Sequence, residues 1–138
     1  MSDVRITAGP FTFAARWEEQ RSPRTVAAFR ERLPFENRII HVRWSGESAW
    51  IPLGDLDLGI GFEYATSYPA PGEILIYPGG VSETEILFPY GDTCFASKAG
   101  QLAGNHFATV VEGAEHLPAI GEIVLWEGAQ DIRFSETT

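Results

Sequence analysis

The histidines are the first residues to consider for chemistry, because a neutral imidazole both donates and accepts hydrogen bonds near neutral pH. The chain has three, His41, His106 and His116, and no two of them form an HxH or HxxxH pair. Without such spacing the sequence predicts no metal site. His106 follows Gly104-Asn105, where a loop enters a predicted strand, and is the best single candidate for a functional side chain.

Cys94 is the only cysteine of the chain, so no internal disulfide can form. A catalytic cysteine needs a base that lowers the pKa of its thiol, and His106 is the nearest histidine along the sequence. His106 and Cys94 are therefore the catalytic candidates, while the simpler interpretation of Cys94 is a small buried thiol. Lys98, in the same segment, either pairs with an anionic ligand or is an ordinary surface amine.

Aromatic side chains gather in the middle third of the chain, where Tyr64 and Tyr68 flank Thr66 and Ser67 in a predicted loop. Tyrosine suits a pocket because it offers apolar area with a polar tip, although the same residues also fit an ordinary barrel core and rim. We expect this loop to form one wall of a groove. The predicted ligand-binding residues are Tyr64, Tyr68, Phe95, Lys98, His106 and Phe107.

Glu83 and Glu85 are two residues apart, so both side chains point to one face of a strand. Two such carboxylates can share a proton or bind a cation, and the alternative is a solvated strand edge.

These residues lie among many short elements, which the 14 glycines and 9 prolines punctuate. Alternating apolar residues, and short apolar runs bounded by turns, predict strands at 4–8, 38–44, 73–77, 106–111 and 122–126. Ser22 and Pro23 begin the one predicted main helix, over 23–33, which we place across one barrel opening. We expect a mainly β fold, a closed barrel of about eight strands with short helical turns beside the main helix. The predicted core includes Trp44, Ile74, Ile76, Val110, Val124 and Trp126.

Composition limits the function classes. The 138 residues predict a single domain over 1–138. A net charge of -9 repels phosphate, so nucleic acid and anionic membranes are poor partners. The first residues lack the apolar stretch of a secretory signal, and we expect a cytoplasmic location. Gly59-Ile60-Gly61 lacks the third glycine of a dinucleotide fingerprint, and we expect no cofactor.

Several segments resemble the cyclophilins. The stretch 105–115, with its Val111-Glu112-Gly113 turn, is similar to a strand and turn near the cyclophilin C-terminus, and Leu102-Ala103-Gly104-Asn105-His106 is similar to a segment beside the cyclophilin active site. Tyr68–Leu75 resembles a strand entry of the same family. Over roughly residues 4–134 the chain resembles a family of small cyclophilin-like proteins of uncharacterised function, DUF3830.

This resemblance implies a closed eight-stranded barrel with His106 at the rim of a groove. It does not imply prolyl isomerase chemistry, which in cyclophilins depends on the arginine of an Arg-x4-Phe-x2-Gln strand. Residues 44–132 contain no arginine, and Gln101 stands where the family has a tryptophan. A shared fold does not by itself carry the activity.

Three functions remain open from the sequence. The first is a domain that binds a small molecule or peptide in a groove at one barrel face, without prolyl isomerase activity. The second is an enzyme that acts on an amide or cyclic amide through His106 with Cys94 or a tyrosine, and the third is residual prolyl isomerisation. We expect an uncharged or anionic ligand with a planar polar group, and a homo-oligomer, most simply a two-fold dimer.

Overall fold

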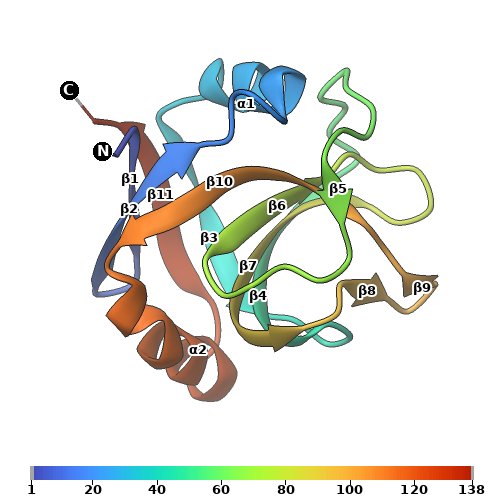
Figure 1. Ribbon diagram of the computed structural model, residues 1–138. Coiled ribbons are helices and arrows are strands. Elements are labelled where there is room, and N and C mark those ends of the chain that lie inside the picture. Colours follow the sequence, from blue (N-terminus) through green and yellow to red (C-terminus); the bar gives the residue numbers. More distant parts are fainter. Residues whose placement is uncertain (1, 138) are drawn as a thin grey trace.

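The computed structural model describes residues 2–137 and shows a closed antiparallel barrel (Figure 1). Eight strands follow one another around it in the order β2-β1-β11-β3-β4-β7-β6-β10, and the pairing of β10 with β2 closes the ring. The barrel predicted from the sequence is thus confirmed. The two ends of the chain lie side by side, because β1 and β11 are paired neighbours (Figure 1).

The strands are β1 (Val4–Ala8), β2 (Phe11–Trp17), β3 (Phe35–His41), β4 (Gly46–Gly54), β5 (Ala65–Thr66), β6 (Glu73–Tyr77), β7 (Thr84–Thr93), β8 (Ala96–Ser97), β9 (Gly100–Gln101), β10 (Gly104–Glu112) and β11 (Gln130–Glu136). The helices are α1 (Pro23–Arg30), the short 3₁₀ turn η1 (Ala114–His116) and α2 (Leu117–Trp126). β8 and β9 form a separate hairpin, which projects from the barrel in Figure 1.

The predicted alternation holds in the opening hairpin. Val4, Ile6 and Ala8 of β1 are fully buried, and Arg5 between them is exposed. A strand with one face on the core and one face in water has this pattern. β6 and the first part of β7 differ, because consecutive residues from Ile74 to Tyr77 and from Thr84 to Pro89 are buried. Both faces of this part of the wall are therefore covered.

The two helices close the barrel interior. Val26 and Phe29 of α1 join the main core, where Phe29 packs on Phe107 and Phe134 with ring centroids 5.2 Å and 5.1 Å apart. α1 is shorter than the predicted helix, since it ends at Arg30. α2 contributes Leu117, Ile120 and Val124 to the same core. Among residues 2–137, no helix combines the length and the apolar character needed to cross a membrane.

The predicted strand at 122–126 is wrong, because this segment is the second half of α2. A short apolar run does not distinguish a strand from a buried helix. The burial of Leu117, Ile120 and Val124 follows the helical spacing, and Pro118 stands in the first turn. Trp126 consequently lies on the outer side of the helix with 76% of its surface exposed, whereas Val124 is buried as predicted.

The predicted strand at 38–44 is shifted and its faces are reversed. β3 covers 35–41 and buries Ile39, while Ile40 is 38% exposed. Successive strand residues face opposite sides, so choosing the wrong alternate residue inverts the whole strand. Trp44 lies beyond β3, in the turn before β4, and is outside the core with 54% of its surface exposed. Of the other predicted core residues, Ile74 and Ile76 are fully buried and Val110 is partly buried against the core.

A second, smaller core lies on the outer face of the wall formed by β4, β6 and β7. Leu75, Tyr77 and Leu87 alternate with the inward-facing Ile76 and Ile86, so they point away from the barrel interior. The remaining members of this outer core are Val42, Phe95 and Leu102, with Trp50 packed against them. The segment 93–103, which contains the β8–β9 hairpin, covers this outer face.

Candidate functional site

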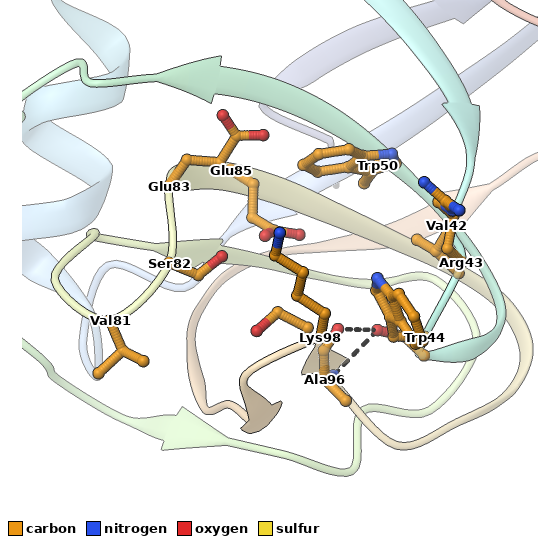
Figure 2. A pocket seen from close by; sticks show the side chains of 12 residues that line it. Val42, Arg43, Trp44, Trp50, Val81, Ser82, Glu83, Glu85, Ala96 and Lys98 are labelled. Atoms are coloured by element: carbon orange, nitrogen blue, oxygen red, sulfur yellow. Dashed lines mark hydrogen bonds between the residues drawn. The ribbon is translucent and has the colours of Figure 1, made fainter.

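A cavity of about 460 Å³ lies beside the outer core, between the barrel wall and the β8–β9 hairpin (Figure 2). Its volume falls within the range of roughly 300–1,000 Å³ that is usual for small-molecule sites. The lining comes from the β3–β4 turn, from β4, from the β6–β7 loop, from the start of β7 and from the hairpin: Val42, Arg43, Trp44, Ser45, Trp50, Val81, Ser82, Glu83, Glu85, Ala96, Ser97 and Lys98.

Glu85 is the distinctive polar group of this cavity. It belongs to β7, pairs across the sheet with Tyr77 of β6 and Pro52 of β4, and is only 5% exposed. Among the residues that the structure describes, no side chain forms a hydrogen bond or salt bridge with its carboxyl group. Burial, and then the charge of Glu83, raise the pKa of Glu85 to about 8. The group is therefore mostly protonated at pH 7.

Two tryptophans form the apolar walls. Trp50 is half-buried against the outer core, and Trp44 stands at the mouth of the cavity (Figure 2). The guanidinium of Arg43 lies 5.8 Å from the centre of the Trp44 ring, within the range of a cation–π contact.

The hairpin is fixed to the β3–β4 turn by Ser45, which is 2% exposed. Its hydroxyl donates to the carbonyl oxygen of Ala96 at 3.0 Å and accepts from the backbone N–H of the same residue at 2.9 Å (Figure 2). These two bonds hold the far wall of the cavity in place. Lys98, in the turn after Ala96-Ser97, reaches back from the hairpin toward Glu85 in Figure 2.

No group of three or more His, Cys, Asp or Glu side chains within 2–137 is arranged to hold a metal ion. Glu83 and Glu85, which could bind a cation or share a proton according to the sequence, line the same cavity.

His106 belongs to a different part of the molecule. It is 6% exposed and does not line the cavity at Glu85. The hydroxyl of Thr109 donates to the Glu18 carboxylate at 2.6 Å, so its oxygen accepts from Nε2 of His106 at 2.7 Å. Burial lowers the pKa of His106, and the imidazole is neutral at pH 7. This chain of hydrogen bonds ties β10 to the segment after β2, so the imidazole stabilises the fold around β10.

Tyr64 covers the exposed side of His106. Their rings are stacked with centroids 5.4 Å apart. The Arg21 guanidinium lies 4.8 Å from the centre of the tyrosine ring and donates a hydrogen bond to the tyrosine hydroxyl at 2.7 Å. Tyr64 adopts a positive φ of 47°, which is uncommon for a residue with a side chain. The loop before β6 is thus pinned onto β10.

The structure separates the other predicted site residues. Lys98 lines the cavity, whereas Phe95 is fully buried in the outer core and Phe107 in the main core. Tyr68 is 68% exposed and lines no described cavity. Cys94 is exposed, so the interpretation as a buried thiol is wrong. The hydrogen bond of the His106 ring goes to Thr109, and none within 2–137 joins it to Cys94.

Trp44, Trp50 and Arg43 were missed as cavity residues. The even-numbered positions 40, 42 and 44 share one face, which we assigned to the core from the sequence. That face is the outer one, and Trp44 lies beyond the end of β3, in the turn that lines the cavity. The Glu83–Glu85 spacing was the signal that pointed to this site.

Comparison with solved structures supports the fold. A structure of McbB in complex with tryptophan matches with a TM-score of 0.70 and 17% sequence identity, over 96% of this chain and 44% of McbB. The solution structure of the hypothetical protein AF2241 from Archaeoglobus fulgidus matches with a TM-score of 0.62 and 16% identity, over 99% of this chain and 95% of that one. This chain therefore spans less than half of the McbB length. At these identities the likeness establishes the barrel fold alone.

Comparison by sequence gives the family. No curated protein matches this chain. The family model of a protein of unknown function, DUF3830, matches residues 4–136, which is nearly the whole sequence. The resemblance seen in the sequence is thereby confirmed, and the chain belongs to the DUF3830 family.

Proposed function

We propose that this protein binds a small organic molecule in the cavity between the barrel wall and the β8–β9 hairpin. One observation carries the proposal: Glu85 is 5% exposed, has no polar side-chain partner within residues 2–137 and faces an open space of about 460 Å³. Its carboxyl oxygens are not sealed inside the protein but open onto this space. A ligand or solvent in the cavity therefore supplies the hydrogen bonds that no side chain provides.

The shape and chemistry of the lining support a small molecule rather than a macromolecule. Trp44 and Trp50 offer flat apolar surfaces, and a few polar groups surround them, as in most small-molecule sites. The tryptophan bound to McbB, a protein of similar fold, makes an aromatic amino acid a reasonable first probe.

The proposal includes neither prolyl isomerisation nor amide hydrolysis. The arginine-containing motif that the cyclophilin resemblance would require is missing from 44–132. The neutral His106 is committed to Thr109, so the geometry offers Cys94 no general base from this histidine.

The proposal is tested by a thermal-shift screen of small amides, amines, carboxylates and amino acids at pH 7, followed by isothermal titration calorimetry of each hit. A ligand that binds only the folded state raises the unfolding temperature by mass action. Bound ligand should then be placed by chemical-shift changes in the backbone amides of 81–85 and 96–98.

Two variants give the screen its specificity. Trp50→Ala removes one wall and should weaken every hit at least tenfold. Trp126→Ala removes an equally large side chain from the exposed face of α2 and should leave the affinities unchanged. Hits that are equally sensitive to both variants, or shifts confined to β10 and the loop at Tyr64, would disprove the cavity as the binding site.

A further inference from the structure

We propose that the ligand of this cavity is a zwitterion of the amino acid type, with its ammonium group on Glu85 and its carboxylate group on Lys98 and Arg43. This inference rests on the proposed function, since it names the ligand class of the same site. It follows from the way the charged side chains are distributed over the cavity.

Glu85 and the two basic groups occupy different depths, and Glu83 is exposed like the basic groups. Glu85 lies within the wall at 5% exposure, whereas Lys98 and Arg43 are at the rim. Glu83 lies beside Glu85 in the lining. Within the part of the chain that the structure describes, no salt bridge joins any of these four residues to another side chain. Acidic and basic side chains thus face the same space without a salt bridge between them.

A ligand with both charges completes this arrangement. An ammonium group supplies three donors to the buried carboxyl, and a carboxylate accepts from the amine of Lys98 or the fork of Arg43. A simple amine would meet two uncompensated cations at the rim, and a simple carboxylate would meet the two acids. The zwitterion itself adds no net charge to the cavity.

The two tryptophans favour a particular kind of side group on the zwitterion. Trp44 and Trp50 present ring surfaces from two sides of the cavity (Figure 2), and aromatic groups gain by offset or edge-to-face contact with such rings. We therefore infer an aromatic or large apolar side group, for which an indole is a suitable probe.

The pH dependence of the binding affinity distinguishes a zwitterion from a neutral ligand. Besides Glu83, the charged groups that line the cavity with Glu85 are Lys98 from the hairpin and Arg43 from the β3–β4 turn. Tyr77 of β6 is its partner across the sheet, and the tyrosine hydroxyl accepts from the backbone N–H groups of Val81 and Ser82. The carboxyl is mostly protonated in the free protein at pH 7, since its pKa is about 8. An ammonium ligand requires the ionised form, so binding releases a proton and the affinity rises by about tenfold per pH unit below pH 8. A neutral amide prefers the protonated carboxyl and gives the opposite slope.

The test is calorimetry with four indole compounds at pH 6, 7 and 8: L-tryptophan, tryptamine, indole-3-propionate and indole-3-acetamide. We expect L-tryptophan to bind tightest, with proton release measured in buffers of different ionisation enthalpy. Glu85→Gln should abolish the pH dependence. Lys98→Met, at the rim, should reduce the preference for tryptophan over tryptamine, and combining it with Arg43→Met should abolish that preference. Thermal shifts with the twenty amino acids identify a better side group than indole.

The outcomes separate the two proposals. Tighter binding of indole-3-acetamide, or an affinity that falls as the pH rises, overturns the zwitterion and leaves the binding cavity intact. So does a screen in which no amino acid binds but other small molecules do. If no compound of either set binds at the cavity residues, the proposed function itself is wrong.

Discussion

Replacing Glu85 by glutamine should change how the stability of the protein depends on pH. Glutamine has nearly the same shape but does not ionise. The carboxyl has an ordinary pKa of 4.5 and a pKa of about 8 in the folded protein. Between these values the folded state holds a proton that the unfolded state has lost, so the free energy of unfolding falls as the pH rises.

The size of this effect follows from the shift. One pKa unit corresponds to about 1.4 kcal/mol, so the contribution of Glu85 to the free energy of unfolding falls by roughly 3.5 kcal/mol between pH 5 and pH 8. Because Glu85 is almost fully buried, solvent screening reduces this figure little. Glu85→Gln should therefore gain stability relative to the unmodified protein as the pH rises, and the difference should level off above pH 8.

Urea unfolding at pH 5, 6, 7 and 8, followed by circular dichroism, measures this difference. Glu127→Gln, at an exposed position just after α2, is the matched control and should run parallel to the unmodified protein. Parallel curves for Glu85→Gln as well would show that Glu85 is ionised in the folded state at neutral pH. A buried carboxyl without a polar partner would then be the wrong picture of this residue.

Four substitutions test other parts of the structure. Glu83→Gln removes a charge that raises the pKa of Glu85, so a carboxyl ¹³C NMR titration of Glu85 should move to lower pH; an unchanged midpoint would leave burial as the sole cause. Gly121→Ala should lower the free energy of unfolding, measured in urea, by about 1–3 kcal/mol, because its Cβ would overlap the ring of Tyr90. This loss outweighs the gain in helix propensity of about 1 kcal/mol. Its control Gly61→Ala, with open space around it, should stay within about 0.5 kcal/mol, and equal effects of the two would argue against this packing of α2. Phe88→Ala should cost about 3–5 kcal/mol in the same assay because Phe88 is fully buried, and a loss below about 1 kcal/mol would contradict its core position. His106→Ala should lower the free energy of unfolding by about 1–3 kcal/mol through the lost hydrogen bond to Thr109, and should leave ligand affinity at the cavity unchanged. Unchanged stability together with weakened binding would show that His106 belongs to the binding site.

Much of the barrel was determined by local sequence. Period-two alternation marked β1 and β2, the proline and glycine turns around an apolar run marked β6, and the proline after Ser22 marked the start of α1. These patterns depend on which side chains share a face of a single strand or helix, and that relation is fixed by backbone geometry alone. The segment at 122–126 was ambiguous for the same reason, since a few consecutive apolar residues satisfy both a strand and a buried helix.

The site depended on contacts that no local pattern contains. The sequence showed that Glu83 and Glu85 share a face, but a solvated edge and a buried cavity were both compatible with that spacing. What decided between them was the hairpin around Lys98, which Ser45 holds against the outer wall at a separation of 51 residues. The pKa of a carboxyl depends on how much water and which charges surround it, and these are set by segments that only the fold brings together. The sequence by itself therefore determined the barrel and the pairing of the two glutamates, while the tertiary structure alone decided that Glu85 is buried and shares its cavity with two tryptophans.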